Sequence, residues 1–463
     1  MDIITGLFDH MVLQRNAKDT SDAAVSGTSK ANGSLLATVT AKGGKVLKGL
    51  SEVRIGTVRE GVFTAFLKGI PVGGPYTVAL FVADTGGAIL DRRTVKDVLV
   101  GDVWILGGQS NMQGIGDRFT GIKCSNDVRA FFMDDHWGVA KDPIHDLSIA
   151  VDQVHVDLCG GVRCVRAKPV RYCAGPGLPF ALRMKELLGV PQGVIACAHG
   201  GTSMSQWSPA LEKLGGKSLY GAMLRRFSKN GGKVAGIVWY QGCSDANAAA
   251  APLFTRRMKE FVAACRKDFN APSLPFVQVQ ISRVLGWDGD AAKHWNSIQE
   301  QQRLLPAVIS RCLTVPVIDL SLDDAIHVSG HAMLELGRRL AQAMDTLIRG
   351  KIGGKTPIEL KKVSVETDSD HGTANVIVEF ENVAGKLCSG GRPYGFALVG
   401  PLGNANVIDV GLDGKRAVVR SRLPVGQLND YSLHYGFNLD PYCNITDGDG
   451  RSLPVFGPVL IGR

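Results

Sequence analysis

The sequence predicts an α/β protein whose central parallel sheet, covered by helices, is flanked by two β domains. Three observations predict this class. Short alternating runs divided by glycine-rich turns fill residues 1–95, apolar strands alternate with helical stretches over residues 96–350, and residues 356–463 return to β-type runs. Strands that alternate with helices are typical of a parallel sheet with helices on both faces, whereas short alternating strands are typical of antiparallel β structure.

The first 95 residues are expected to form a β-sandwich domain. Residues 35–40 (LLATVT) and 76–82 (YTVALFV) alternate apolar side chains with others. A period of two residues predicts strands with one buried face.

Residues 96–350 are expected to form the central α/β domain. Residues 251–269 and 331–348 have helical periodicity, and apolar residues of the second segment fall on one face: Met333, Leu336, Leu340, Met344 and Leu347. An insertion over residues 115–180, rich in glycine, proline and charge, is expected to shape the rim of a site.

Residues 350–355 are expected to be a linker, and residues 356–463 a C-terminal β domain. The run at 374–380 (ANVIVEF) is typical of its strands. Several domains are also expected from length, because single cores rarely grow beyond about 250–300 residues and this chain has 463.

Composition excludes several partner classes. The net charge of +9 is diffuse, with a small patch at Lys42, Lys45 and Lys48, and no nucleic-acid-binding motif accompanies it. A solvated surface is the favoured explanation, and attraction to acidic glycans is the weaker one. The sequence contains no run of about 18 apolar residues, so no membrane span is predicted. Residues 1–5 lack a signal-peptide pattern, so we expect a cytoplasmic protein, or a periplasmic or extracellular one whose export signal was removed.

The ten cysteines do not have the spacing of a zinc site. Cys197 and Cys312 lie in strand-like apolar runs and are expected to be buried thiols. Four others cluster after residue 120: Cys124, Cys159, Cys164 and Cys173. One or two disulfides are expected only if the protein is exported.

Ser110 is the first candidate catalytic residue. The apolar run at 98–106 ends in Gly107-Gly108-Gln109-Ser110. A buried strand that stops in this way places its next side chain at the carboxyl edge of a sheet, where open α/β folds bind ligands. A serine becomes a nucleophile when a histidine takes its proton. The alternative is that Ser110 caps a helix.

Asp324 and His327 are the candidate partners of this serine. Their three-residue spacing lets one turn place the carboxylate on Nδ1 and leaves Nε2 for the serine. Asp323 is interpreted as a solvated charge, and Asp319 as a turn cap or a group behind the site. A metal pair of His327 with His331 is the alternative, but the intervening Val-Ser-Gly lacks the glutamate of a zincin, so we expect no metal.

Two further apolar runs end in polar, glycine-containing turns, at residues 199–207 (HGGTSMSQW) and 241–247 (QGCSDAN). A tetrahedral oxyanion needs fixed N–H donors. We expect the backbone amides of Ser110 and Gly201 and the side-chain amide of Gln241 to provide three. Gln109, His199 and Trp207 are expected to contact the substrate, although His199 also fits a structural role.

Four motifs in this order resemble the SGNH-type carbohydrate O-acetylesterases, particularly the sialate O-acetylesterase-like (SASA) family. They are Gly-Gln-Ser-Asn-Met at 108–112, Gly-Gly-Thr at 200–202 with a following tryptophan, Trp-Tyr-Gln-Gly at 239–242 and Asp-x-x-His at 324–327. Residues 7–14, 73–78 and 454–456 resemble that family's flanking β segments. The resemblance implies a flavodoxin-like SGNH-hydrolase sheet.

The resemblance also implies a serine esterase that removes acetyl groups from carbohydrate hydroxyls through an acetyl-enzyme, without a cofactor. Sialic acids, xylan and xyloglucan fragments are all compatible with it. Relatives commonly carry a glutamate where this chain has Cys243, which shifts the role of triad acid toward Asp324. Cys243 as nucleophile is the rival interpretation, but no adjacent basic residue lowers the pKa of its thiol.

Other classes stay open as alternatives. In an α/β-hydrolase the nucleophile motif would be Gly-x-Ser-x-Gly, but Met112 replaces its second glycine. A glycan-binding protein with an inert central domain is the alternative outside the enzymes. Four tryptophans are candidates for stacking on sugar rings, with core packing as the alternative: Trp137, Trp207, Trp287 and Trp295.

Overall fold

The computed structural model describes residues 1–117, 121–164, 172–287, 290–350, 356–368, 372–401, 403–405 and 407–461. The chain forms two compact units. Unit 1 comprises Met1–Gly200, Gln206–Val238 and Ala263–Leu274, and unit 2 comprises Gly201–Ser205, Trp239–Val262 and Pro275–Arg463. These units divide the predicted central domain between them, so the three-domain organisation stays a prediction.

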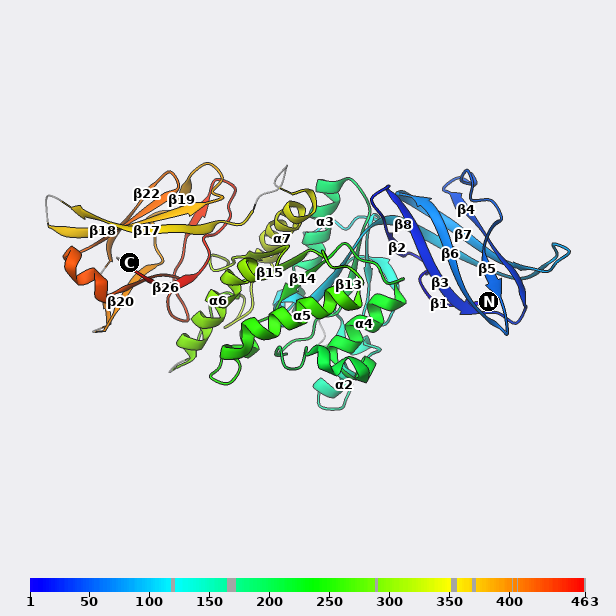
Figure 1. Ribbon diagram of the computed structural model, residues 1–463, viewed down its shortest axis with the longest axis horizontal. Helices are drawn as coiled ribbons and strands as arrows, with labels where there is room; N and C mark the ends of the chain where they lie inside the picture. The colour runs from blue at the N-terminus through cyan, green and yellow to red at the C-terminus, as the bar shows by residue number, and fades with distance from the viewer. Residues whose placement is uncertain are drawn as a thin grey trace. The chain divides into compact units, whose positions relative to one another are not determined.

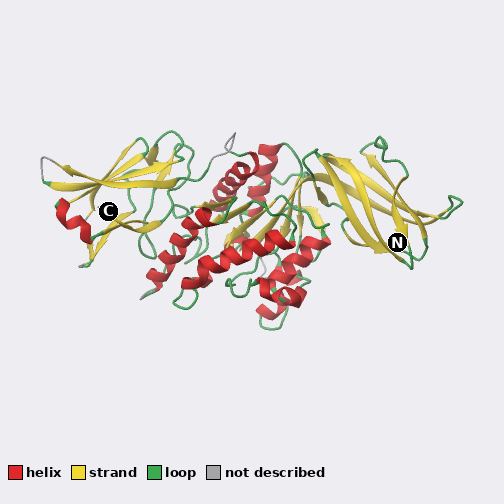
Figure 2. Cartoon of the chain, viewed as in Figure 1, coloured by secondary structure: helices red, strands yellow, loops and turns green. Residues whose placement is uncertain are grey.

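The N-terminal part of unit 1 is β structure in two sheets, drawn in yellow in Figure 2. One sheet contains β1 (Asp2–Thr5), β3 (Thr20–Thr28) and β6 (Val62–Pro71). In the other, β4 (Gly33–Ala41) lies between β5 (Val53–Val58) and β7 (Gly73–Ala83), and β7 and β2 (Val12–Gln14) both pair with β8 (Ile89–Gly108). Every second side chain of β3 is buried, as the alternating sequence predicts.

Strand β8 is shared by the N-terminal β structure and the central sheet. Its first half pairs antiparallel with β7, and its last residues pair in parallel with β13 (Gln192–Ala196). The predicted domain boundary at residue 95 therefore lies inside one continuous strand. The second half of β8 is completely buried from Val98 to Gly108, and it leads directly to Ser110.

The sheet of unit 1 has the order β11-β10-β13-β8-β14, with β10 (Val128–Phe131), β13 and β8 parallel. β11 (Trp137–Val139) pairs antiparallel with β10, and β14 (Gly236–Tyr240) passes from unit 1 into unit 2 after Val238. The helices are α1 (Ser110–Gln113), α2 (Gln153–Leu158), α3 (Gly177–Leu188) and α4 (Leu219–Lys229) (Figure 1).

The predicted insertion at 115–180 therefore does more than shape a rim, because β10 and β11 extend the central sheet. A short antiparallel pair, β9 (Gly116–Asp117) with β12 (Tyr172–Ala174), joins the two ends of the same segment. Arg129 interrupts the apolar pattern of β10, but its guanidinium is 2.9 Å from the Asp97 carboxylate. That ion pair makes a charge tolerable in a buried strand.

In unit 2, the sheet continues from β14 to β15 (Phe276–Val279) and β16 (Cys312–Val315), which are parallel. Its helices α6 (Ala291–Val308) and α7 (Ala332–Arg349) pack on β16, and α5 (Phe254–Asp268) begins in this unit. The helices predicted at 251–269 and 331–348 are confirmed as α5 and α7. Met333, Leu336, Leu340 and Met344 are buried, as their shared face predicts.

The C-terminal part of unit 2 is β structure around one apolar core that includes Val376, Phe380, Leu398 and Leu433. One sheet has the order β17 (Glu359–Asp368), β18 (Thr373–Glu381), β23 (Arg416–Ser421) and β22 (Val407–Asp413). A second has the order β21 (Gly403–Ala405), β20 (Phe396–Gly400), β24 (Ser432–Tyr435) and β26 (Phe456–Leu460). β19 (Leu387–Ser389) pairs with β25 (Ile445–Asp447).

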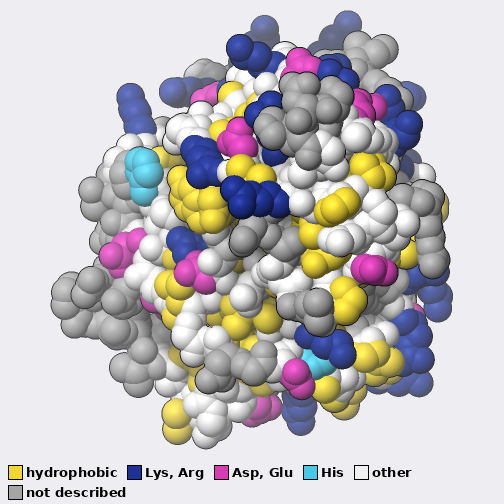
Figure 3. Space-filling view, turned by 90° about the vertical axis from the view of Figure 1, so that its left-hand side faces the viewer, with side chains coloured by type: hydrophobic (Ala, Val, Ile, Leu, Met, Phe, Trp, Pro, Cys, Tyr) yellow, Lys and Arg dark blue, Asp and Glu magenta, His cyan; other side chains and the backbone are white. Residues whose placement is uncertain are grey.

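The predicted linker falls mainly on residues 351–355, which lie outside the described residues. Within the described part of the chain, no helix has the length and apolar character needed to cross a membrane. In the face shown in Figure 3, lysine and arginine side chains are interspersed with acidic and hydrophobic ones. This agrees with the diffuse charge expected from the sequence.

Candidate functional site

Ser110 lies at the point where β8 ends and α1 begins, in unit 1. It is half-buried between Gln109 and Asn111, which are 3% and 1% exposed. Gln109, not Ser110, occupies the position before the helix, so the structure does not support a capping role for the serine. Its hydroxyl is thus carried by the second residue after a buried strand that ends in two glycines, at the carboxyl edge of the sheet.

The turn after β13 approaches Ser110 closely because residue 200 is glycine. The backbone N–H of Gly200 donates to Gln113 Oε1 at 2.7 Å. A Cβ at position 200 would lie 3.1 Å from that oxygen and 3.4 Å from the Cβ of Ser110. A Cβ here would press on the Gln113 side chain and would lie in van der Waals contact with the serine, which favours glycine at this position of the Gly-Gly-Thr motif.

Gln241 ties two segments of unit 2 together. Its Nε2 donates to the backbone oxygen of Thr202 at 3.1 Å and to Asp245 Oδ2 at 2.5 Å. The N–H of Met204 donates to the same carboxylate oxygen at 2.8 Å. Both Nε2 hydrogens are therefore engaged, and direct donation from Gln241 to an oxyanion would require one of these bonds to break.

Asp245 is a member of this site that the sequence analysis missed. It is fully buried, and burial raises the pKa of its carboxyl despite hydrogen bonds from Met204 and Gln241. The sequence Gln-Gly-Cys-Ser-Asp at 241–245 could have indicated this contact, because Asp245 follows Gln241 by one helical turn.

Gly201 is exposed with φ of 69°, and open space surrounds the position that a Cβ would take.

Asp324 and His327 lie on one tight loop of unit 2. Asp324 Oδ2 is 2.6 Å from His327 Nδ1, and Oδ1 accepts the backbone N–H groups of Ile326 and His327, each at 2.8 Å. The contact expected from the Asp-x-x-His spacing is therefore present. Burial raises the pKa of Asp324, but the His327 side chain and the two backbone donors outweigh it, so the pKa lies below its usual value.

The neighbouring carboxylates have structural partners. Asp323 is exposed, as its interpretation as a solvated charge requires, and its Oδ2 also accepts the N–H of Gly330 at 2.7 Å, which helps to hold the far end of the loop. Asp319 makes two hydrogen bonds, of 2.8 and 2.6 Å, to the buried guanidinium of Arg339. His331 is exposed at the position before α7. Among the described residues, no three metal-ligating side chains gather in one place.

The substrate-contact residues expected from sequence are largely buried. Trp207 has no exposed surface, so it packs in the core and cannot stack on a sugar. His199 is 5% exposed and stacked on His155, with ring centroids 5.1 Å apart. Burial lowers the pKa of His199 to about 4, which keeps the ring neutral. Gln109 is buried as well.

The remaining candidates separate in the same way. Trp137 and Trp295 are buried and donate their indole N–H groups to Asn230 and to the backbone of Ser282. Trp287 is 45% exposed, so it alone of the four candidate tryptophans presents a broad surface.

Cys243 is a buried thiol. Burial raises its pKa to about 12, which weighs against the rival interpretation of Cys243 as a nucleophile. Cys197 and Cys312 are buried free thiols, as predicted. Cys159 and Cys164 form a disulfide.

The sequence from residue 100 to residue 346 matches the model of a protein family described as carbohydrate esterase, sialic acid-specific acetylesterase. The match covers more than half of the chain. The chain belongs to this family of carbohydrate esterases. The matched segment contains Ser110, Gly201, Gln241 and the loop of Asp324 and His327, so every residue proposed for catalysis from the sequence lies within it. The protein is therefore a hydrolase of the carbohydrate acetylesterase family.

Relatives of known name agree with this assignment. A probable carbohydrate esterase of Arabidopsis thaliana is 28% identical over 263 residues, which are 52% of this chain and 89% of that protein. Human sialate O-acetylesterase is 28% identical over 205 residues, covering 38% of this chain and 37% of the human protein.

A carbohydrate acetylesterase from Xanthomonas citri has a similar structure over 98% of both chains, with a TM-score of 0.70 and 22% identity. At this identity, the likeness establishes the fold. It extends beyond the catalytic segment to both flanking β parts.

Proposed function

We propose that this carbohydrate esterase is a serine enzyme that removes O-acetyl groups from carbohydrates through an acetyl-enzyme. The observation that carries the proposal is the loop in which Asp324 accepts from His327 Nδ1 and from two backbone amides. Three hydrogen bonds fix this carboxylate although it is 48% exposed. A proton held on Nδ1 leaves Nε2 as the basic nitrogen of the ring.

In the proposed reaction, Ser110 attacks the carbonyl carbon of the acetyl ester while His327 takes the proton of its hydroxyl. The tetrahedral intermediate collapses, His327 returns the proton to the sugar oxygen, and the deacetylated alcohol leaves. Water then attacks the acetyl-enzyme with His327 again as the base, and acetate is released. Asp324 orients the imidazole and stabilises its positive charge.

The backbone N–H groups of Ser110 and Gly201 are the proposed oxyanion donors. The glycine at 201 suits this role because the residue is exposed and no heavy atom of the described residues lies within 4 Å of the place that a Cβ would take. We assign Gln241 a positioning role in the same hole: its bonds to Thr202 and Asp245 hold the segment that carries Gly201.

The strand order supports an SGNH-hydrolase arrangement for the central sheet. If the outer strands β10 and β11 are set aside and β8, β13, β14, β15 and β16 are numbered in chain order, their order in the sheet is 2-1-3-4-5. This is the order of flavodoxin-like sheets, in which ligands bind at the carboxyl ends of the strands next to the first one. Ser110 follows the carboxyl end of that first strand.

The test is hydrolysis of 4-nitrophenyl acetate by the wild type and by Ser110→Ala, with mass spectrometry of the intact protein during turnover. We expect an adduct with the mass of one acetyl group on the wild type and none on the variant. Ser110→Ala and His327→Ala should each lower kcat by several orders of magnitude, and the double variant by little more, because triad members act as a unit. A Ser110→Ala protein with more than about a tenth of the wild-type rate contradicts the assignment.

A folded wild type that hydrolyses neither 4-nitrophenyl acetate nor acetylated glycans would favour the second candidate, a glycan-binding protein with an inert hydrolase-like domain. The observation behind this candidate is an open cavity, lined partly by aromatic side chains, in the C-terminal β structure.

A further inference from the structure

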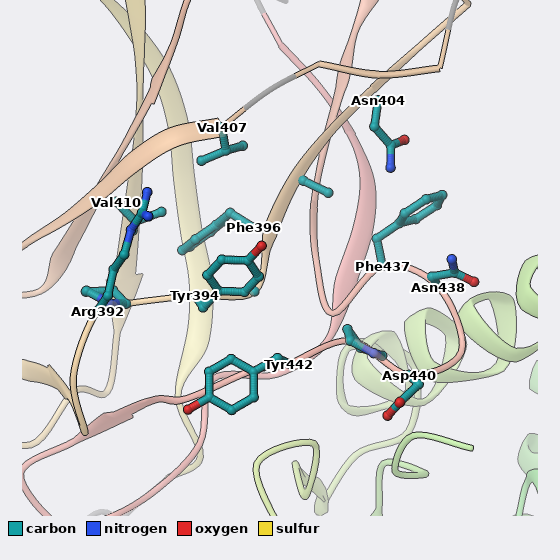
Figure 4. Close-up of a pocket in the computed structure, with 14 residues that line it drawn as sticks. Arg392, Tyr394, Phe396, Asn404, Val407, Val410, Phe437, Asn438, Asp440 and Tyr442 are labelled. Carbon is teal, nitrogen blue, oxygen red and sulfur yellow. The ribbon is translucent and has the colours of Figure 1, made fainter. Parts of the chain in front are cut away.

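A cavity of about 440 Å³ opens in the C-terminal β structure of unit 2, outside the segment matched by the family model. It lies between the loop joining β19 to β20 and the segment joining β24 to β25. Figure 4 shows the rings of Tyr394 and Tyr442 near one another, with Arg392 on one side and Phe437, Asn438 and Asp440 on the other. The volume falls in the range of small-molecule sites, and the proposed catalytic residues do not line it.

The two tyrosines form an exposed aromatic surface. Tyr394 is 54% exposed and Tyr442 is 64% exposed, and their ring centroids are 6.0 Å apart. A tyrosine ring offers an apolar face together with a polar hydroxyl, which suits a ligand with both characters. Two such rings left open to solvent beside a cavity point to a ligand rather than to core packing.

The backbone around Tyr394 is fixed before any ligand arrives. Asn444 accepts the N–H of Tyr394 at 2.8 Å, and its Nδ2 donates to the backbone oxygen of Arg392 at 2.9 Å. A Cβ at Gly395, whose φ is 123°, would lie 2.6 Å from the Tyr435 ring, so only glycine fits next to Tyr394. A surface held in this way loses little conformational entropy on binding.

Both apolar and polar side chains line the cavity around the rings: Val407, Val410 and Phe437 are apolar, and Arg392, Asn404, Asn438 and Asp440 are polar. Arg392 and Asn404 are exposed, and Asp440 is paired with Arg283 at 2.5 Å. A pyranose ring has an apolar C–H face and an edge of hydroxyl groups that both donate and accept hydrogen bonds. Aromatic faces bordered by the amides of Asn404 and Asn438 match that combination. The guanidinium of Arg392 also donates to the backbone oxygen of Ile408, so it is held at the border of the cavity.

A second cavity of unit 2 adjoins the first and is lined by residues that come shortly before the loop of His327 in the sequence. This second cavity, of about 320 Å³, shares Asp440, Pro441 and Tyr442 with the first and is also lined by Leu320 and Ser321, which precede the Asp324 loop.

Backbone hydrogen bonds also connect the segment of Tyr442 with the loop of Asp324 and His327. The N–H of Val284 donates to Leu439 at 2.9 Å, and that of Leu285 donates to Ala325 at 2.8 Å. Ala325 lies between Asp324 and His327, so two adjacent residues connect the Tyr442 segment with the loop of the proposed base.

We propose that Tyr394, Tyr442 and the two adjoining cavities form a binding site for a carbohydrate chain, in which sugar units distant from the acetylated one stack on the tyrosines. The substrate is then an acetylated oligosaccharide or polysaccharide and not a free acetylated monosaccharide. This inference rests on the proposed function for the role of the His327 loop, but the sugar site itself can be measured without catalysis.

The kinetic test uses partially acetylated xylo-oligosaccharides and gluco-oligosaccharides of one to six units. For the wild type, kcat/KM should rise with chain length in one of the two series. In the double variant Tyr394→Ala, Tyr442→Ala, the ratio of kcat/KM for the hexamer to that for 4-nitrophenyl acetate should fall at least about tenfold, which is about 1.4 kcal/mol. Phe66→Ala, which removes an exposed ring from β6, is the matched control and should leave the ratio unchanged.

A length series of the double variant that runs parallel to that of the wild type overturns the proposal. A wild-type series that is flat in both sugars overturns it as well. The thermal unfolding midpoint of each variant should stay close to that of the wild type, because both rings are exposed.

Binding separates the failure of this site from failure of the proposed mechanism. Isothermal titration of the Ser110→Ala protein with unacetylated xylohexaose and cellohexaose should show binding of at least one, lost in the added Tyr394→Ala, Tyr442→Ala background. If no substrate is hydrolysed but this difference is found, the sugar site stands and the proposed esterase mechanism fails. Equal binding by both proteins, or binding by neither, overturns the site.

Discussion

Replacing Asp324 by asparagine should lower kcat for 4-nitrophenyl acetate about a thousandfold with little change in KM. The wild-type carboxylate accepts three hydrogen bonds, of which the one from His327 Nδ1 is 2.6 Å long. An asparagine Oδ1 can still accept the two backbone N–H groups, so the loop should keep its shape. The amide nitrogen would then face Nδ1 and favour the tautomer with the proton on Nε2, which cannot act as the base.

The magnitude follows from the exposure of the carboxylate. Loss of a triad carboxylate in this manner costs about 10⁴ in kcat where the acid is buried. Asp324 is 48% exposed, so water screens part of its charge and the expected cost is about 10³, or about 4 kcal/mol of transition-state stabilisation.

Asp323→Asn and Asp319→Asn are the matched controls for this prediction. Asp323 accepts a hydrogen bond from the backbone N–H of Gly330, and Asp319 accepts one from Arg339. Both substitutions should therefore lower mainly the thermal unfolding midpoint, and each should lower kcat by less than about tenfold. Circular dichroism should confirm that each variant is folded before its steady-state kinetics are compared. An equal or larger loss of kcat in Asp319→Asn would refute the reasoning and assign the acid role to Asp319.

Three other outcomes are expected. Gln241→Ala should lower kcat roughly a hundredfold, because Thr202, the residue after Gly201, loses the hydrogen bond that its backbone oxygen accepts from Gln241, although Met204 keeps its bond to Asp245. Cys243→Ala should keep most activity, and the reverse ranking in steady-state assays would assign chemistry to the thiol. Asp135→Asn should lower the free energy of unfolding by about 3 kcal/mol near neutral pH, because this carboxylate pairs with Arg225, Arg226 and Lys229. Burial raises the Asp135 pKa but those cations outweigh it, so the folded pKa lies below the unfolded one; the difference between wild type and variant in urea titrations should therefore shrink as pH falls below about 4, and a constant difference would contradict this. Dialysis against EDTA should leave the rate of hydrolysis unchanged. A loss of activity that added zinc reverses would instead support a metal site formed by His327 and His331.

Periodicity and turn chemistry predicted much of the fold because they are local properties. The apolar face of α7 and the alternation in β18 can be read from neighbouring residues, and both elements are present. The contact between Asp324 and His327 is equally local, since one turn closes it. The burial of Arg129 in β10 could not be predicted in this way. It depends on an ion pair with Asp97, which lies 32 residues earlier in the sequence.

The less local parts of the site could not be predicted in the same way. The position of Trp207 after the Gly-Gly-Thr motif predicted a contact with substrate. Its complete burial depends on packing against residues elsewhere in the chain, which the motif does not specify. The pairing of Tyr394 with Tyr442 depends on Asn444 joining two loops of different strands. Asp245 was within reach, because its one-turn distance from Gln241 is a local signal.

The continuity of β8 has a consequence for how this chain can be divided. A protein that began at residue 96 would keep the last residues of β8 but lose β7 and β2, its partners at residues 98–101, and the exposed ladder would be a template for aggregation. The same loss of strand partners is expected when the segment from residue 96 onward is expressed alone or released by limited proteolysis. Removing the N-terminal β structure would thus also remove strands that hold in place the segment leading to Ser110, the proposed nucleophile.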